Sequence, residues 1–137
     1  ELVVDFSEGD GDYVSEDKLQ EVWSPQFDYC LQVDDDLYFA AVQKHQVESA
    51  DYVNHSCDPT CGVKDKLKLV AMRDIHPGEE ITFDYAMTES SDYSFECNCG
   101  RTNCRKKVTG DDWKIPELQK KYKGYFSEYL EKKIVAQ

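Results

Sequence analysis

The chain has 137 residues, of which 40% are hydrophobic, and it carries a formal net charge of −12 at pH 7. This length and composition predict one compact domain with a modest core rather than two independent domains. Because 28 acidic residues face only 16 basic ones, a surface that binds nucleic-acid phosphates directly is not expected, and a basic partner is favoured. The alternative is that the acidity only keeps a small protein soluble.

The hydropathy pattern gives no sign of a membrane protein. No stretch approaches the roughly 20 apolar residues needed to cross a bilayer, and the N-terminus lacks the basic-then-apolar pattern of a secretory signal. We therefore expect a soluble protein without a membrane partner.

A short strand and a short helix are predicted at the start of the chain. The apolar run at residues 2–6 predicts a strand, and the acidic, glycine-containing segment 7–12 predicts the loop that follows it. Ser15 is a suitable N-cap for a helix over residues 16–22, which Pro25 prevents from continuing.

Further short strands are predicted in the middle of the chain, over residues 29–33, 37–41, 66–72 and 81–83. The acidic triplet Asp34–Asp36 separates the first two, which predicts a hairpin with a solvated turn. Pro77 and Gly78 predict the turn between the last two.

The C-terminal segment is predicted to be helical. Pro116 is suitably placed to begin a helix that runs through Tyr122, and Gly124 is suitably placed to end it. Ser127 is a candidate cap for a second helix that extends to about Val135. Apolar side chains at helical spacing in this segment predict packing on the body of the protein.

The six cysteines are clustered in a way that suits a metal better than three disulfides. Cys97, Cys99 and Cys104 have the spacing C-x-C-x4-C, and Gly100 between them permits a tight turn. Three thiolates can converge on one ion from such a segment. Reduced thiols in turn predict an intracellular protein, either cytoplasmic or nuclear.

A structural zinc site requires a fourth ligand, because structural zinc is usually tetrahedral. Cys57 and Cys61 are the candidates, and His55 and His76 are poorer ones. Spacing alone does not choose between the two cysteines. We expect a structural ion, since so small a segment gains folding energy from metal binding and since four thiols leave no open position for catalysis.

Three motifs together resemble the SET-domain protein lysine methyltransferases, in particular the short stand-alone SET proteins with a post-SET zinc motif. The motifs are Asn54-His55-Ser56-Cys57, the segment Gly78–Tyr85 with the sequence GEEITFDY, and the three-cysteine cluster, and they occur in the family's order over roughly residues 50 to 105. The resemblance implies a mostly β fold, the β-clip-like SET fold of short strands, with short C-terminal helices and a post-SET zinc site. It divides the chain into a SET domain at residues 1–90 and a post-SET zinc segment with a helical tail at residues 91–137.

The resemblance also implies two bound groups, S-adenosylmethionine and a structural Zn²⁺. It assigns the zinc to Cys57, Cys97, Cys99 and Cys104, with Cys61 as the remaining alternative for the fourth ligand. It assigns cofactor contacts to Asn54, His55, Tyr85 and Asn98, with the imidazole of His55 near the adenine.

Three aromatic residues are implied to form the catalytic site. The hydroxyl of Tyr85 is expected where the methyl group passes from sulfur to nitrogen, and Tyr29 is expected to line the lysine channel. Phe83 takes the position of the family's Phe/Tyr switch, which implies room for di- or trimethylation. Without the resemblance, each of the three would be interpreted as an ordinary strand or core residue.

The implied function is S-adenosylmethionine-dependent methyl transfer to the side-chain amine of a lysine in a basic protein or peptide, of which a histone tail is one candidate. The Gly-x-Gly segment that ordinarily precedes the first strand of the family is missing here, and we expect that residues were lost before Glu1. The alternative reading is a catalytically inactive, zinc-stabilised SET-like protein-binding module. A third reading, a zinc protein that binds nucleic acid, is opposed by the negative charge.

Overall fold

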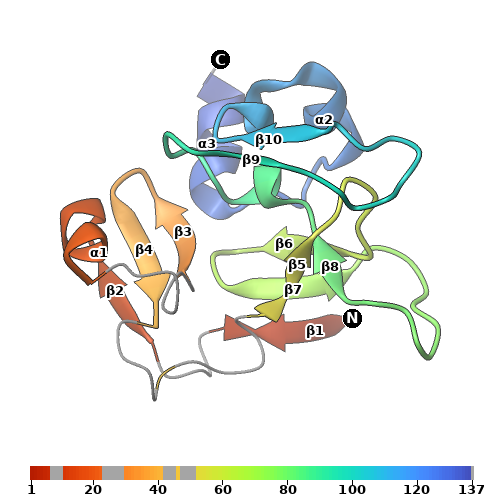
Figure 1. Ribbon diagram of the computed structural model, residues 1–137, viewed down its shortest axis with the longest axis horizontal. Coiled ribbons are helices and arrows are strands. Elements are labelled where there is room, and N and C mark those ends of the chain that lie inside the picture. Colours follow the sequence, from red (N-terminus) through yellow and green to blue (C-terminus); the bar gives the residue numbers. More distant parts are fainter. Residues whose placement is uncertain (7–10, 23–29, 42–45, 47–51, 137) are drawn as a thin grey trace.

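The computed structural model describes residues 1–6, 11–22, 30–41, 46 and 52–136. Within this part of the chain, short strands make up small sheets, and two of the three α-helices lie near the C-terminal end (Figure 1). The strands are β1 (Leu2–Asp5), β2 (Asp12–Val14), β3 (Cys30–Asp34), β4 (Leu37–Ala40), β5 (Asn54–His55), β6 (Cys61–Lys64), β7 (Lys68–Ala71), β8 (Thr82–Phe83), β9 (Ser94–Glu96) and β10 (Lys107–Thr109). The helices are α1 (Glu16–Val22), α2 (Pro116–Lys121) and α3 (Glu128–Ala136), with 3-10 turns η4 (Tyr85–Met87) and η5 (Asp112–Lys114). The mostly β architecture with short C-terminal helices is therefore confirmed.

The first sheet has the order β1-β7-β6 and is antiparallel throughout. The alternation that predicted a strand at residues 66–72 is explained by its burial pattern, because Leu67 and Leu69 enter the core whereas Lys68 stays partly exposed. Strand β6 was not predicted. It is only four residues long and contains Gly62, so its sequence carries no clear alternation.

The second sheet contains the predicted hairpin. Strands β3 and β4 pair antiparallel around a turn in the acidic triplet, and β2, which was expected to be loop at its start, pairs along the other side of β4. The Ser15 side chain accepts the backbone N–H of Lys18 at 3.3 Å, which confirms it as a cap of α1. Asp36 in the hairpin turn accepts the backbone N–H of Glu16 at 2.8 Å, so the hairpin also fixes this helix end.

Two very short pairings place the motifs. Strand β5 lies parallel to β8, with Asn54 opposite Thr82 and His55 opposite Phe83. This pairing brings the NHSC segment against the segment that ends in Tyr85. Strands β9 and β10 pair antiparallel on either side of the three-cysteine segment, so they close it into one loop.

The C-terminal helices pack on the body of the protein, as their apolar spacing predicted. Helix α2 begins at Pro116, and Gly124 follows it with a φ of 85°, a conformation that glycine adopts without strain. The capping role expected for the Ser127 side chain is wrong, because its buried hydroxyl has no hydrogen-bond partner. Tyr129 donates a hydrogen bond to the carbonyl of Thr88, just after η4. The tail thus contacts the segment that follows Tyr85.

The main core is formed by side chains from β3, β6, β7, β8, η4 and the C-terminal segment. It includes Val33, Val63, Leu69, Phe83, Met87, Tyr122, Phe126 and Leu130. Among the described helices, none is both long and apolar enough to span a membrane.

Candidate active site and metal centre

Four cysteine sulfurs converge between the NHSC segment and the loop that β9 and β10 enclose. The Sγ atoms of Cys57, Cys97, Cys99 and Cys104 all lie within 4.8 Å of one another. The Sγ atoms of Cys57 and Cys97 are 3.9 Å apart, close to the separation of about 3.8 Å that two sulfurs have in a tetrahedron with Zn–S bonds of about 2.3 Å. This thiol cluster could hold a zinc ion.

The chain folds locally in a way that brings these sulfurs together. The carbonyl of Lys106 accepts the N–H of Cys97, and the carbonyl of Arg101 accepts the N–H of Cys104. Gly100 has a φ of 75°, which permits the tight turn between them. Cys61 lies elsewhere, fully buried on β6 in the main core. Of the two candidates for a fourth ligand, it is therefore Cys57 whose sulfur lies in the cluster.

The surroundings shift the pKa values of the Cys57 and Cys99 thiols in opposite directions. Burial raises the pKa of the Cys57 thiol to about 12, which keeps it neutral at pH 7 unless a cation binds. Burial also raises the pKa of the Cys99 thiol. Hydrogen bonds from backbone N–H groups, such as that of Arg101, and from neighbouring thiols have a larger opposite effect, so the pKa of Cys99 falls to about 6. A divalent metal ion would supply the charge that the buried thiolates need.

The imidazole of His55 joins the thiol cluster to Tyr85. Its side chain is only 4% exposed. Its Nδ1 accepts the backbone N–H of Tyr85 at 3.0 Å, so its proton resides on Nε2, which lies 3.3 Å from the Cys57 Sγ. Burial lowers the pKa of His55, which favours this neutral tautomer. The ring also packs edge-on against Phe95, with centroids 5.6 Å apart.

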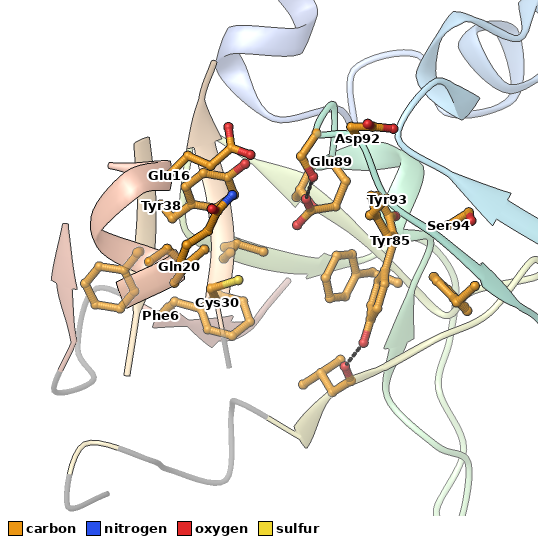
Figure 2. Close-up of a pocket in the computed structure, with 18 residues that line it drawn as sticks. Phe6, Glu16, Gln20, Cys30, Tyr38, Tyr85, Glu89, Asp92, Tyr93 and Ser94 are labelled. Carbon is orange, nitrogen blue, oxygen red and sulfur yellow. Dashed lines mark hydrogen bonds between the residues drawn. The ribbon is translucent and has the colours of Figure 1, made fainter. Parts of the chain in front are cut away.

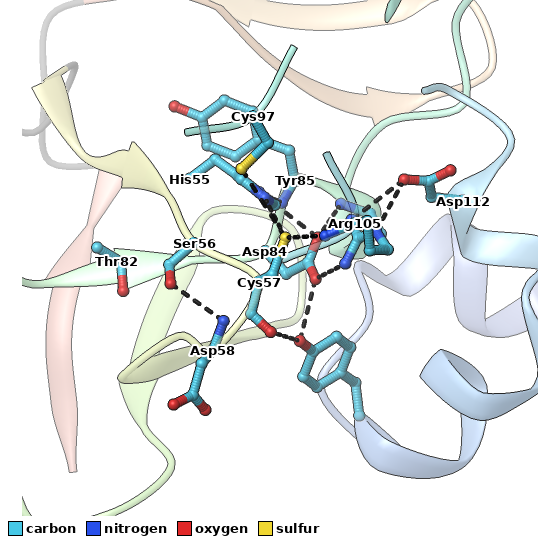
Figure 3. A network of polar contacts seen from close by, with 12 residues as sticks. His55, Ser56, Cys57, Asp58, Thr82, Asp84, Tyr85, Cys97, Arg105 and Asp112 are labelled. Carbon is cyan, nitrogen blue, oxygen red and sulfur yellow. Dashed lines mark hydrogen bonds and ion pairs between the residues drawn. The ribbon is translucent and has the colours of Figure 1, made fainter. Parts of the chain in front are cut away.

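A second connection runs through a buried ion pair beside Tyr85 (Figure 3). Arg105 donates two hydrogen bonds to the Asp84 carboxylate, at 2.6 and 2.9 Å, and a third to Asp112 at 3.1 Å. The hydroxyl of Tyr122 donates to the same Asp84 carboxylate at 3.0 Å. We call Asp84, Arg105, Asp112 and Tyr122 the Asp84 clasp.

Tyr85 borders a cavity of about 570 Å³ (Figure 2). Its hydroxyl donates to the carbonyl of Val53 at 2.8 Å, and its ring lies 4.9 Å from that of Phe83 and 5.9 Å from that of Phe95. Tyr93 stacks at 6.0 Å on Phe95, so the wall of the cavity on this side is aromatic. The carboxylate residues Glu16, Glu89 and Asp92 also line the cavity.

The remaining predicted site residues are placed as follows. Asn54 is exposed and donates from its side chain to Glu80 at 2.7 Å, and Asn98 is exposed between two of the clustered cysteines. Among the described cofactor candidates, Tyr85 lines the cavity, whereas Asn54, His55 and Asn98 do not. Tyr29 lies outside the described residues.

Several residues of the site were not singled out from the sequence, namely Asp84, Phe95, Arg105 and Tyr122. Asp84 lies within the GEEITFDY motif but was given no role, and Arg105 directly follows the last cysteine of the cluster. These positions were the available signal. The ion pair between Asp84 and Arg105 joins positions 21 residues apart, and a pattern of neighbouring residues does not predict such a contact.

The family is shown by a comparison of the whole chain with family models. The SET domain model matches residues 1–86, which is more than half of the chain. The chain therefore belongs to the SET-domain family.

The relatives are histone-lysine methyltransferases. The chain is 39% identical over 84 residues to the H3 lysine-4 specific histone-lysine N-methyltransferase of Schizosaccharomyces pombe, a match that covers 56% of this chain and 9% of the relative. It is 38% identical over 85 residues to histone-lysine N-methyltransferase set1 of Dictyostelium discoideum, covering 57% of this chain and 6% of the relative. The chain thus spans less than a tenth of the length of either protein.

A solved structure also resembles the chain. It is the crystal structure of KRYPTONITE in complex with mCHG DNA and SAH, with a TM-score of 0.46, 29% identity, and coverage of 58% of this chain and 20% of that chain. A similarity at this score does not bear on function.

Proposed function

We propose that this chain catalyses methyl transfer from S-adenosylmethionine to the side-chain amine of lysine in a basic protein. The observation that carries the proposal is the position of Tyr85 in a SET-domain chain. Its ring borders an aromatic cavity, while its backbone is held by the His55 ring that contacts the thiol cluster. A tyrosine held in this way is suited to alignment of a small reacting group.

The cavity has a size suited to a small ligand and a substrate side chain. Its volume of about 570 Å³ lies within the range of roughly 300–1,000 Å³ that small-molecule sites occupy. S-adenosylmethionine, when bound, supplies a methyl group carried on a positively charged sulfur. By the resemblance, we assign its contacts to Tyr85 at the cavity and to Asn54, His55 and Asn98, which lie outside the cavity lining. Because both ring nitrogens of His55 have partners within the protein, we expect its contribution to come from its backbone or the ring face.

The aromatic wall would prepare the lysine for reaction. An ammonium has no lone pair, so it must lose its proton first, and its ordinary pKa is about 10.4. The rings of Tyr85, Phe83 and Phe95 would remove it from water, and desolvation lowers the pKa of an amine. A shift of about three units corresponds to about 4 kcal/mol. Alignment of the amine would contribute further, since positioning supplies about 7–11 kcal/mol in favourable cases.

Individual roles follow from these positions. The Tyr85 hydroxyl would orient the reacting amine or methyl group, and Tyr29 is assigned to the lysine channel by resemblance. Phe83 is buried and has no hydroxyl to hold a water molecule against the amine. We therefore infer that the channel leaves room for two or three methyl groups.

A structural zinc ion is proposed at the thiol cluster, held by Cys57, Cys97, Cys99 and Cys104. When bound, it supplies folding energy to the segment between β9 and β10. We propose that the SET domain comprises residues 1–90 and that residues 91–137 form a post-SET zinc segment and tail. Contacts such as Asp84 with Arg105 would join these two parts. Since thiols must be reduced to bind zinc, an intracellular location is proposed.

The substrate is proposed to be basic. Glu16, Glu89 and Asp92 line the cavity (Figure 2), and the net charge of −12 favours a lysine- and arginine-rich partner. The S. pombe relative is named as specific for H3 lysine 4, which makes a histone H3 tail the first substrate to test. Direct contact with nucleic acid is not proposed.

The test combines cofactor binding with product analysis. The full chain, loaded with zinc, is titrated with S-adenosylmethionine by calorimetry and then incubated with H3-tail peptides and other lysine-containing basic peptides. We expect heat of binding and peptide mass increases of one or more methyl groups. An absence of both would reject the enzyme and leave a zinc-stabilised binding module as the better description.

A further inference from the structure

The Asp84 clasp is a buried, charged structure that methyl transfer does not itself require. The Asp84 side chain is fully buried and that of Arg105 is 16% exposed. Removing such charges from water is costly unless geometry and hydrogen bonding are good. Here the Arg105 guanidinium makes a bidentate contact with the Asp84 carboxylate and also donates a hydrogen bond to Asp112. So complete a set of partners holds both carboxylates in one orientation.

The clasp acts on Tyr85 through the backbone. Asp84 is the N-cap of η4, the turn that begins at Tyr85, and its Oδ1 accepts the N–H of Ala86 at 3.0 Å. The same Oδ1 is 2.9 Å from a guanidinium nitrogen of Arg105. A rotation of this carboxylate would therefore release the first turn that carries the Tyr85 ring.

The clasp is also connected to the thiol cluster. Arg105 directly follows Cys104, and its backbone N–H donates to the Cys57 Sγ at 3.4 Å. Tyr122, which donates to the Asp84 carboxylate, also lies 3.4 Å from the Cys57 carbonyl through its hydroxyl. The position of the Arg105 side chain thus depends on how well the cysteine cluster next to it is ordered.

We propose that Arg105 is a positioning residue that couples metal binding at the thiol cluster to the placement of Tyr85. The ordered cluster fixes the Arg105 backbone, the guanidinium fixes Asp84, and Asp84 fixes the turn at Tyr85. The catalytic part of this inference rests on the proposed function, whereas the coupling itself does not. Metal would then do more than stabilise its own segment, because it would order the active-site tyrosine.

The test uses Arg105→Lys, which keeps the charge but loses the planar fork that holds Asp84 and Asp112 together. We expect kcat to fall about 100-fold, because a displacement of the Tyr85 side chain by about 1 Å can lower the rate by this factor. The KM for peptide and the zinc content should not change. Arg73→Ala is the matched control, since Arg73 pairs with Glu79 on the surface, away from the cavity lining, and it should leave kcat unchanged.

A second readout does not require activity. In the zinc-loaded protein, we expect hydrogen exchange at the Tyr85 and Ala86 amides to be slow, and to speed up either on chelation of the metal or in Arg105→Lys with metal bound. Exchange in β6 and β7 should stay slow in the Arg105→Lys protein. Unchanged exchange at Tyr85 and Ala86 in this variant would overturn the inference, whatever the activity.

Asp84→Asn provides the second variant. It keeps the size of the side chain but weakens its contact with Arg105, and it should raise exchange at the same two amides while zinc stays bound. Loss of zinc from both Arg105→Lys and Asp84→Asn would overturn the inference, because the clasp would then only support the metal segment. A wild-type protein that methylates no peptide would reject the proposed function but leave the exchange result to decide the coupling.

Discussion

His55 holds the backbone of Tyr85, because its Nδ1 accepts the Tyr85 N–H at 3.0 Å while its Nε2 faces the Cys57 Sγ at 3.3 Å. One neutral ring thereby contacts both the tyrosine at the cavity and a cysteine of the thiol cluster. A hydrogen bond from Nε2 would stabilise a thiolate at Cys57. The NHSC segment thus orients the turn at Tyr85 and contacts the thiol cluster through the same side chain.

Replacement of His55 by alanine should weaken zinc binding. Loss of a group that hydrogen-bonds to a metal ligand typically lowers metal affinity about 10–100-fold, and we expect a decrease in this range. Competition with a chromophoric chelator measures it. His76→Ala is the matched control, since His76 is exposed and contacts Glu79 through its backbone. Equal affinities in the two variants would contradict the role assigned to the His55 ring.

Cys57 and Cys61 should behave differently on substitution. Cys57→Ala removes one of the four converging sulfurs, so we expect the zinc-to-protein ratio after dialysis to fall well below one. Cys61→Ala removes a buried core thiol outside the cluster, so it should keep one zinc and lose about 1 kcal/mol of stability to the smaller side chain. Metal analysis together with thermal unfolding measures both. Zinc loss from the Cys61 variant but not the Cys57 variant would contradict the assignment.

Alkaline pH should destabilise the protein partly through Tyr38, which is buried and borders the cavity. Burial raises the pKa of Tyr38 to about 12, and the charges of Glu89 and Glu16 add to this effect. Because the pKa of a tyrosine in the unfolded chain is about 10, the neutral Tyr38 side chain makes its full contribution to folding stability below about pH 10. It declines as the pH rises from about 10 toward 12, since the unfolded chain loses the proton first.

The measurement is the free energy of urea unfolding at several alkaline pH values for the wild type and Tyr38→Phe. The wild type should lose stability faster than the variant above about pH 10. The difference in slope should be less than the roughly 1.4 kcal/mol per pH unit that one full proton would give. Parallel curves for the two proteins would contradict the environment assigned to Tyr38.

Much of the fold was predictable because several elements carry strong local signals. The alternation around Leu67 and Leu69, the acidic hairpin turn and Pro116 each have a direct physical meaning, and each of these predictions is confirmed. Strands β5, β9 and β10 have only two or three residues. Elements this short show no periodicity, so they were missed.

The candidate site was predictable in its motifs but not in its connections. The cysteine spacing indicated a metal, yet it left Cys57 and Cys61 equivalent. The parallel pairing of β5 with β8, which no sequence pattern predicted, shows why Cys57 lies beside the turn at Tyr85. The contact between Asp84 and Arg105 depends on how two distant segments pack, and a sequence does not report such packing. The catalytic roles of Tyr85, Tyr29 and Phe83, the cofactor contacts of Asn54, His55, Tyr85 and Asn98, and zinc binding by the four cysteines stay predictions.

The most direct test of the account is methyl transfer by zinc-loaded wild-type protein and by Tyr85→Phe, followed by mass spectrometry of a lysine-containing basic peptide. We expect methylated peptide from the wild type and a rate lower by about 100-fold or more from the variant, because the hydroxyl at the cavity is lost while the ring remains. Zinc content and thermal unfolding of the two proteins should agree. Near-normal methylation by Tyr85→Phe would contradict the account.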